Sequence, residues 1–435
     1  MPAWPGPVGA SRGRLSPRDI DPDALKVVRK LLAGGHEAYL VGGCVRDLYL
    51  KRLPKDFDVA TSATPEAIRK TFRNSRIIGR RFKLAHVFYG PKIIETSTFR
   101  TAPESRGDDD PLITVDNEWG TVEDDARRRD FTINALFYDI ASNTVVDFVD
   151  GLHDLDRGVI RTIGDPVVRF QEDPVRMIRA IKFAARLDFT IDDETWEALL
   201  DTAGDINKCS RARLLEEIYK IFRGGAARRS FELLLESRLL HEIMPSYLAL
   251  HRERLVEAGK DRPGREVDPI LFELLDALDE HTAETQSVAS NGVVLAILFA
   301  PLVDDDWSGA PRRTIDRALE ELMNEFSVAL GVARKDRELA REVLVARHRM
   351  IDLQRGSGRR RSTLAQRQHF HDALVFLGIC VRAYRAGGSE LQFWQRLAAQ
   401  ATRGPAEGER RARPRKRRRR PRNRGGRAAG DAGSS

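Results

Sequence analysis

The β-strand patterns of this chain end before about residue 166, and helical patterns continue from there to about residue 399. Short apolar runs at 38–41, 84–89 and 93–99 are rich in β-branched and aromatic residues and predict strands. Gly90 and Pro91 separate the last two runs and predict a hairpin. Downstream, apolar residues recur at the spacing of one helix face. We therefore predict an α+β fold class, in which a small head with a mixed sheet is followed by an all-helical neck and body.

Other head elements follow from local patterns. Alternation at 56–60 predicts a strand, and Thr64 followed by Pro65 is typical of a helix start. The apolar segment 131–140 predicts a helix, and 145–148 predicts a further strand.

The positive charge of the chain is concentrated in one segment. Residues 403–427 carry thirteen Lys and Arg and two Glu, a net charge of +11 within an overall +8, so the rest of the chain is slightly acidic at −3. Such a segment repels itself and has little apolar surface to bury, so we expect a disordered arginine-rich tail. It would bind a polyanion, unless it serves only to keep the protein soluble.

Composition also excludes several classes of protein. The longest apolar run, 292–303, contains Pro301 and is too short to span a bilayer, so no membrane span is expected. The N-terminus lacks the apolar core of a secretory signal. Three widely spaced cysteines argue against a disulfide framework or a zinc knuckle. A cytoplasmic location fits best.

Asp56 and Asp58 are the first candidate functional residues. On a strand, residues two apart project from the same face, about 7 Å apart along the chain. Two carboxylates this close resist joint ionisation unless a cation neutralises them, and oxygen ligands suit Mg²⁺ or Mn²⁺. Alone, the pair is weak evidence, and a solvated strand edge would be the favoured interpretation.

Gly42 and Gly43 strengthen this interpretation. A strand that ends in two glycines before a helix presents backbone N–H groups and a positive helix end to a phosphate. Arg46 lies in the first turn of that helix and could reach the same phosphates. A phosphate cradle ten to fifteen residues from a carboxylate pair is more specific than either feature alone.

Two later motifs add candidates. In the first, Arg129 could pair with phosphate while Asp130 binds a ribose hydroxyl or helps to hold metal. Glu95 interrupts an apolar strand and is the rival for this third carboxylate; we favour Asp130. The second motif places acceptor and donor groups along one helix face, where they could read a base edge. Its residues are Asp173, Arg176, Arg179 and Lys182.

These motifs together resemble the class II tRNA nucleotidyltransferase and bacterial poly(A) polymerase family. The resemblance implies a polymerase-β-like nucleotidyltransferase head. Residues 77–87, 116–121 and the C-terminal region look like the poly(A) side of the family. The segments that carry the family resemblance are 40–47, 55–61, 128–135, 147–164 and 172–180.

The implied activity is template-independent addition of AMP from ATP to single-stranded RNA 3′ ends, which marks RNA for decay. Asp56 and Asp58 would bind two Mg²⁺ as the catalytic metal ligands, with Asp130 as a third catalytic carboxylate. RNA-decay proteins, not identified by the sequence, would be partners. The residues implied to bind the nucleotide are Gly42, Gly43, Arg46, Arg129, Asp173, Arg176, Arg179 and Lys182.

Two alternatives stay open: a CCA-adding tRNA nucleotidyltransferase, and a non-catalytic RNA-binding protein on the same fold. A binding module has no need of the pair Asp56 and Asp58, which argues for an enzyme. The expected division is a disordered leader (1–18), a catalytic head (19–165), a helical neck with base-recognition and RNA-binding elements (166–227), an RNA-binding helical body (228–402) and the tail (403–435).

Overall fold

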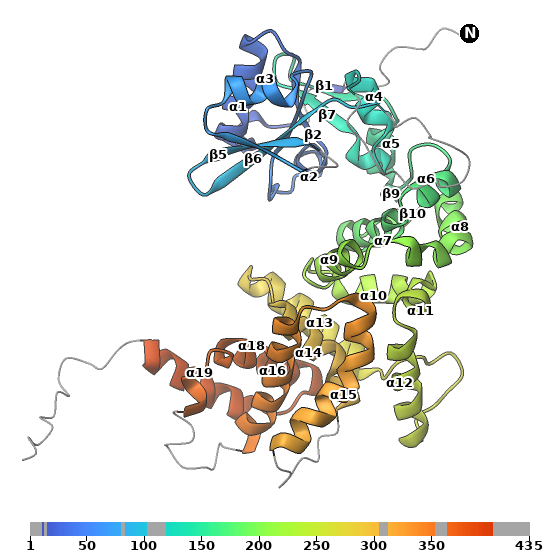
Figure 1. The fold of residues 1–435 in the computed structure, drawn as a ribbon, viewed down its shortest axis with the longest axis vertical. Helices are drawn as coiled ribbons and strands as arrows, with labels where there is room; N and C mark the ends of the chain where they lie inside the picture. Colours follow the sequence, from blue (N-terminus) through green and yellow to red (C-terminus); the bar gives the residue numbers. More distant parts are fainter. Residues whose placement is uncertain are drawn as a thin grey trace, which may run out of the picture.

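The head sheet and the helical body lie at opposite ends of an elongated molecule, with the neck helices between them (Figure 1). The computed structural model describes residues 11–12, 15–79, 83–101, 119–303, 312–352 and 363–402. The tail expected at 403–435 and residues 116–118 of the segment 116–121 lie outside the described residues.

The head is built on one eight-stranded mixed sheet with the order β1-β8-β7-β2-β3-β6-β5-β4. β3 and β6 are parallel, and the other neighbours are antiparallel. The predicted hairpin is confirmed as β5 and β6. The strands are β1 (Ser11–Arg12), β2 (Ala38–Val41), β3 (Asp58–Thr61), β4 (Ser75–Ile78), β5 (Leu84–Tyr89), β6 (Lys92–Thr98), β7 (Leu136–Asp139) and β8 (Thr144–Asp147).

The two faces of the sheet are covered differently. On one face Val28 of α1 packs with Val59 and Ile94 in the main core. On the other face Ala126 of α4 packs with Phe137 in a smaller cluster. The head helices are η1 (Pro17–Asp19), α1 (Pro22–Ala33), α2 (Gly43–Tyr49), α3 (Pro65–Thr71), α4 (Val122–Arg127), η2 (Thr132–Asn134) and α5 (Gly151–Arg157).

The neck is centred on α7, whose apolar side is fully buried at Met177, Ile178 and Ile181. Asp165 caps α6 by accepting from the N–H groups of Val167 and Val168. The neck elements are β9 (Val159–Ile160), α6 (Pro166–Glu172), α7 (Val175–Leu187), β10 (Thr190–Ile191), α8 (Asp193–Thr202), η3 (Ala203–Lys208) and α9 (Arg211–Phe222).

The body consists of helices in the described ranges beyond the neck. Trp394 closes its C-terminal end, since its indole Nε1 donates to the Met350 carbonyl at 2.9 Å and its ring is fully buried. The body elements are α10 (Ala227–Glu236), α11 (Leu239–Ile243), α12 (Pro245–Glu257), α13 (Ile270–Thr285), α14 (Asn291–Phe299), η4 (Ala300–Leu302), α15 (Arg312–Leu330), α16 (Arg334–Asp352), α18 (Phe370–Tyr384) and α19 (Gly388–Thr402).

Several expectations need correction. Residues 131–140 form η2 and strand β7 rather than a helix, because β7 is a central strand. Part of the expected leader has regular structure, since β1 pairs with β8. The neck is helical except for β9 and β10, which pair with each other. In the described ranges, no helix combines the length and apolar character that crossing a membrane requires.

Candidate active site

The glycine turn between β2 and α2 begins the site. Gly42 has φ +75° and ψ −128°, a conformation that side chains other than glycine rarely adopt. A Cβ at Gly42 would lie 3.2 Å from Nη1 of Arg129, and one at Gly43 would lie 3.6 Å from Nη2 of Arg46. The structure therefore places both predicted arginines against the two glycines.

Arg46 is held on several sides. Its Nε and Nη2 donate to Oδ1 of Asp47 at 2.8 and 2.7 Å, and its Nη1 donates to Oδ1 of Asn134 at 2.6 Å. The side chain is only 3% exposed, and this burial lowers its pKa. Arg46 is thus a fixed part of the wall beneath the glycine turn, and Asp47 and Asn134 are the positioning residues that hold it.

The carboxylate pair does not lie on one strand as expected. β3 begins at Asp58, so Asp56 stands before the strand and is exposed, whereas Asp58 is half-buried. In the parallel pairing of β3 with β6, Glu95 is the direct partner of Asp58. Cross-strand partners project from the same face, so Glu95 is the carboxylate that the sheet brings beside Asp58.

Negative charge accumulates at Asp58. Burial, the Glu95 carboxylate and Asp56 raise the pKa of Asp58 to about 6, against the opposing effect of Arg129. Within the described ranges, no three His, Cys, Asp or Glu side chains are gathered closely enough to form a metal cluster. The donor set is nevertheless all oxygen, and Arg129 opposes only part of its negative charge, which suits a hard divalent cation.

Asp130 joins the head to the neck. Its Oδ2 accepts from Nε and Nη2 of Arg179 at 2.7 and 2.5 Å. Its Oδ1 accepts from the N–H of Phe131 and from Nδ2 of Asn134. Burial alone would raise the pKa of Asp130, but the ion pair with Arg179 and these hydrogen bonds lower it to about 2. Both oxygens are therefore engaged within the protein.

Arg129 is held by Asp125, a residue that the sequence analysis missed. Asp125 is fully buried in α4 and accepts from Arg129 at 2.9 Å and from Arg128 at 2.8 Å. Burial would raise the pKa of Asp125, but the two arginines lower it overall. The guanidinium of Arg129 also lies 5.2 Å from the ring centre of Phe137. The signal available in the sequence was an acid three and four residues before two arginines.

A cavity of about 350 Å³ opens where head and neck meet. It collects five of the predicted residues, together with Arg213 and Glu217, which the sequence analysis missed. No local pattern marks these two residues, because they approach the site only when α9 packs on α7. The lining residues are Arg128, Arg129, Asp130, Asp173, Val175, Arg176, Arg179, Arg213, Glu216 and Glu217.

Ion pairs and hydrogen bonds connect the neck residues that line this cavity to their neighbours. Asp173, which ends α6, accepts from Nη2 of Arg213 at 2.8 Å. Arg176 is nearly buried, and its Nη1 donates to Glu172 at 2.9 Å and to the Arg169 carbonyl at 2.8 Å. These contacts give the cavity a defined shape and a polar wall of alternating charge.

Lys182 is absent from the residues that line this cavity. Its Nζ lies 2.5 Å from Oε2 of Glu217. Burial and the nearby Arg179 lower the pKa of Lys182 to about 8 against the effect of Glu217. Its ammonium also lies 5.0 Å from the ring centre of Phe183, which contacts Phe131 edge-on. Lys182 is therefore connected to the cavity through its ion pair with Glu217, which lines it.

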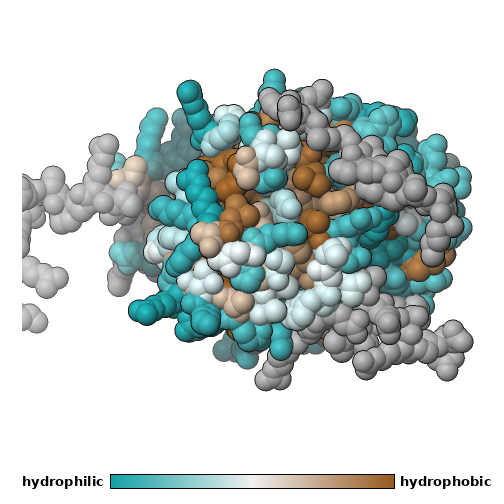
Figure 2. Space-filling view, turned by 90° about the horizontal axis from the view of Figure 1, so that it is seen from above, coloured by the Kyte–Doolittle hydropathy of each residue, from teal (hydrophilic) through white to brown (hydrophobic). Residues whose placement is uncertain are grey.

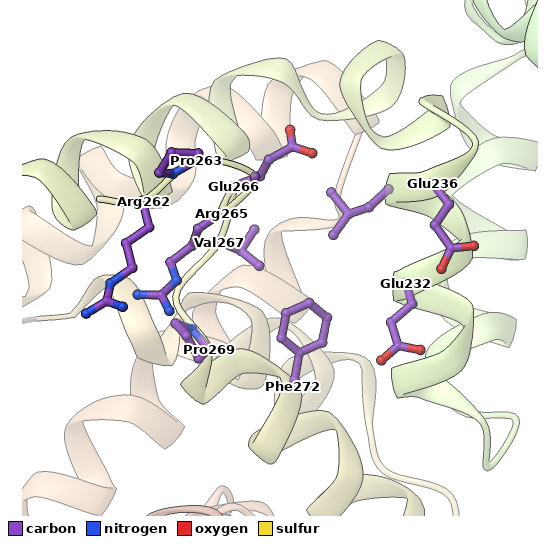
Figure 3. Close-up of a pocket in the computed structure, with 11 residues that line it drawn as sticks. Glu232, Glu236, Arg262, Pro263, Arg265, Glu266, Val267, Pro269 and Phe272 are labelled. Atoms are coloured by element: carbon purple, nitrogen blue, oxygen red, sulfur yellow. The ribbon is translucent and has the colours of Figure 1, made fainter. Parts of the chain in front are cut away.

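A larger cavity of about 580 Å³ lies in the body and includes none of the predicted site residues (Figure 3). Arg262 and Arg265 project from the loop that follows α12, and Glu232 and Glu236 project from α10 on the other side. Phe272 of α13 lies between them. The cavity lacks both the glycine turn and the carboxylate pair.

Comparison with known proteins gives a consistent pattern. Residues 38–161 match the family described as Poly A polymerase head domain, and 188–250 match Probable RNA and SrmB-binding site of polymerase A. Residues 309–425 match Polymerase A arginine-rich C-terminus. The chain is 36% identical to Poly(A) polymerase I of Salmonella typhi over 430 residues, which cover 92% of this chain and 90% of the relative.

CCA-adding enzymes are also similar, over less of the sequence. The Bacillus subtilis CCA-adding enzyme is 37% identical over 237 residues, which cover 54% of this chain and 58% of that protein. Among solved structures, the Bacillus stearothermophilus CCA-adding enzyme in complex with CTP has a TM-score of 0.63 and 25% identity. That match covers 88% of this chain and 83% of the other, so the two share their overall architecture.

Proposed function

We propose that the chain, which belongs to the poly(A) polymerase family, uses three parts of its structure to adenylate RNA: the glycine turn, the carboxylates Asp56, Asp58 and Glu95, and the head–neck cavity. The protein is a nucleotidyltransferase that adds AMP from ATP to RNA 3′ ends. The observation that carries this conclusion is the extent of the match: Poly(A) polymerase I is matched over 92% of the chain, and CCA-adding enzyme over 54%.

We assign the triphosphate to the glycine turn. Gly42 and Gly43 allow a phosphate to approach the backbone closely, and the N–H groups of the first helical turn have no acceptor within the helix. Arg129 lies directly against this turn and is fixed by Asp125. Arg46 supports the turn from inside the protein, through its bonds to Asp47 and Asn134.

The metal ligands we propose are Asp56 and Asp58, with Glu95 as the third carboxylate. The raised pKa of Asp58 and the register of Glu95 support this choice, because a bound cation would relieve the repulsion among the three groups. Mg²⁺ or Mn²⁺ bound there would activate the 3′-hydroxyl of the RNA and stabilise the charge of the leaving pyrophosphate. Asp130, which the sequence favoured, has both oxygens committed to neighbouring groups, and we assign it to positioning Arg179.

The adenine base is assigned to the head–neck cavity. Asp173, Arg176 and Arg179 line it and offer acceptors and donors of the kind that read a base edge. Lys182 would act through Glu217 rather than by touching the base. The ion pairs hold these side chains in place, so a base whose edge does not match their donors and acceptors would have polar groups left unpaired.

RNA is expected to contact the neck and body, since residues 188–250 match a probable RNA-binding family segment. A role in RNA processing and decay, a cytoplasmic location and contacts with RNA-decay proteins are proposals that follow from the activity. The domain limits given from the sequence (19–165, 166–227, 228–402) are kept as the proposed division.

Labelled ATP, Mg²⁺ and a short RNA test catalysis against the non-catalytic alternative. We expect labelled RNA that lengthens with time, and no labelled RNA when EDTA is present from the start. Binding of RNA without any incorporation would contradict the assignment and favour a binding protein on the same fold.

A further inference from the structure

A row of polar side chains crosses the head sheet from Asp58 to the sheet edge. Asp58 pairs with Glu95, Glu95 with His86 on β5, and His86 with Arg76 on the edge strand β4. Direct cross-strand partners share a face, so these four side chains form one row. Three strand spacings of about 4.8 Å put Arg76 roughly 14 Å from Asp58. Nε2 of His86 lies 3.5 Å from Oε1 of Glu95, which fixes the middle of the row.

This half of the sheet face is open to solvent. Ala85 and Val87, which point to the other face, are completely buried in the main core. On the open face Ile78 and Ile93 are 38% and 41% exposed. Phe88 is half-buried and lies 6.3 Å from the His86 ring. Seen from the head end, the surface of the molecule carries apolar patches between hydrophilic side chains (Figure 2).

The outer end of the row is strongly basic. A cavity of about 500 Å³ lies at the edge strand, and its lining contains three arginines and no carboxylate among the described residues. Nη1 of Arg69 donates to the Arg73 carbonyl at 2.6 Å, which holds one guanidinium in place. The lining residues are Arg69, Arg73, Asn74, Ser75, Arg76, Ile77 and Phe88.

We propose that this surface, here named the sheet track and defined as His86, Phe88, Arg73 and Arg76, holds the RNA strand a short distance upstream of its reacting 3′ end. Single-stranded nucleic acids are bound by basic grooves with aromatic side chains on which bases stack. The track supplies both features and leads directly to Asp58. The proposal rests on the proposed function, since it takes RNA to be the acceptor.

The distance from Asp58 decides which part of the RNA is bound. Because the backbones of Asp58 and Arg76 are roughly 14 Å apart across the sheet, we expect Arg76 to lie beyond the terminal nucleotide that reacts. It would meet a phosphate further upstream, and Phe88 would meet the base of a nucleotide between the two. The track therefore adds affinity for RNA without changing the binding of ATP.

Arg76→Ala is the direct test, with Arg29→Ala as its matched control. Arg29 is also exposed and lies on α1, which covers the opposite face of the sheet. Affinity for a fluorescent fifteen-residue oligo(A) is measured by anisotropy over a range of salt concentrations. Removing one phosphate contact should flatten the log–log salt slope by about 0.7. Arg29→Ala should leave the slope at its wild-type value.

Phe88→Ala and Phe88→Tyr test the stacking contact. Loss of one stacked base costs about 1–3 kcal/mol by alanine substitution, so the KM for oligo(A) should rise about tenfold in Phe88→Ala. Phe88→Tyr keeps the ring and should restore most of the loss. The KM for ATP should stay unchanged in both variants.

The outcomes separate this proposal from the function on which it rests. If the wild-type protein adds no AMP to any RNA, the proposed function fails. If the wild type extends oligo(A) but Arg76→Ala and Phe88→Ala match Arg29→Ala in affinity, salt slope and KM, the sheet track does not hold RNA. The open face would then be free for another class of partner, and this proposal is overturned.

Discussion

The arginines of the head–neck cavity and those of the β4 edge differ in whether a carboxylate pairs with them. In the cavity, Arg129 is paired with buried Asp125 and Arg179 with half-buried Asp130, both at hydrogen-bonding distance. At the edge, Arg76 is exposed in a cavity without a described carboxylate. Paired arginines fix a shape and are little affected by salt, whereas exposed arginines attract a polyanion and are screened. One region thus suits recognition of a single nucleotide, and the other suits affinity for a strand of any sequence.

The largest effect should come from the carboxylates beside the cavity. Asp58→Ala or Asp56→Ala should lower kcat by at least about a thousandfold, because metal-ion catalysis contributes several kcal/mol to the transition state. Asp58→Asn serves as the matched variant that keeps the shape and removes the charge. Turnover of labelled ATP is measured beside the thermal unfolding of each variant. A folded variant that keeps more than about a tenth of the wild-type rate would count against the metal assignment.

Truncation after Thr402 should have the next largest effect and should act only on RNA. If about six tail charges meet phosphates, the salt slope of RNA binding is steeper by about 4 in the full-length protein. Raising salt from about 50 to 200 mM would then remove about two decades of that extra affinity. The KM for ATP should barely change. Equal salt slopes for the two proteins would show that the tail does not hold RNA.

Breaking the ion pair between head and neck should have a moderate effect. The pKa of Asp130 is lowered from 3.8 to about 2, so its charge stabilises the folded state above pH 4, and this contribution is lost as pH falls towards 2. Asp130→Asn should therefore lower the free energy of unfolding by about 2 kcal/mol at pH 7. The difference from wild type should shrink below pH 4 in urea titrations. A difference that stays constant over this pH range would refute the pairing with Arg179.

The smallest effect is expected at Arg213. It is partly exposed and pairs with Asp173, so Arg213→Ala should raise the KM for ATP at most about fivefold. Its KM for RNA and its salt slope should match those of wild type. Arg211→Ala, on the same helix but outside the cavity, is the control. A flatter RNA salt slope in Arg213→Ala, with an unchanged KM for ATP, would contradict the distinction between the two regions.

Local sequence patterns were enough to predict several secondary-structure elements of the head. The apolar run 38–41 became β2, and the predicted hairpin became β5 and β6. The prediction of a helix at 131–140 was wrong because β7 is buried on both faces. Leu136 and Tyr138 face one core and Phe137 the other, so the segment shows no alternation that would distinguish a strand from a buried helix.

The sequence motifs named five of the ten residues that line the head–neck cavity but could not give their pairings. Asp130 and Arg179 are 49 positions apart, and Asp173 and Arg213 are 40 apart. Such ion pairs depend on how α7 and α9 pack, which no local spacing encodes. The choice between Glu95 and Asp130 likewise depended on the register of β3 against β6.

The most direct test of the account is nucleotide choice. Each of the four nucleoside triphosphates is supplied separately with Mg²⁺ to the full-length protein, on oligo(A) and on a tRNA that lacks its CCA end. The account predicts long runs of added A on oligo(A) with ATP alone and poor use of CTP on either RNA. A tRNA that receives two C residues and one A and then stops would contradict it, and would identify the protein as a CCA-adding enzyme.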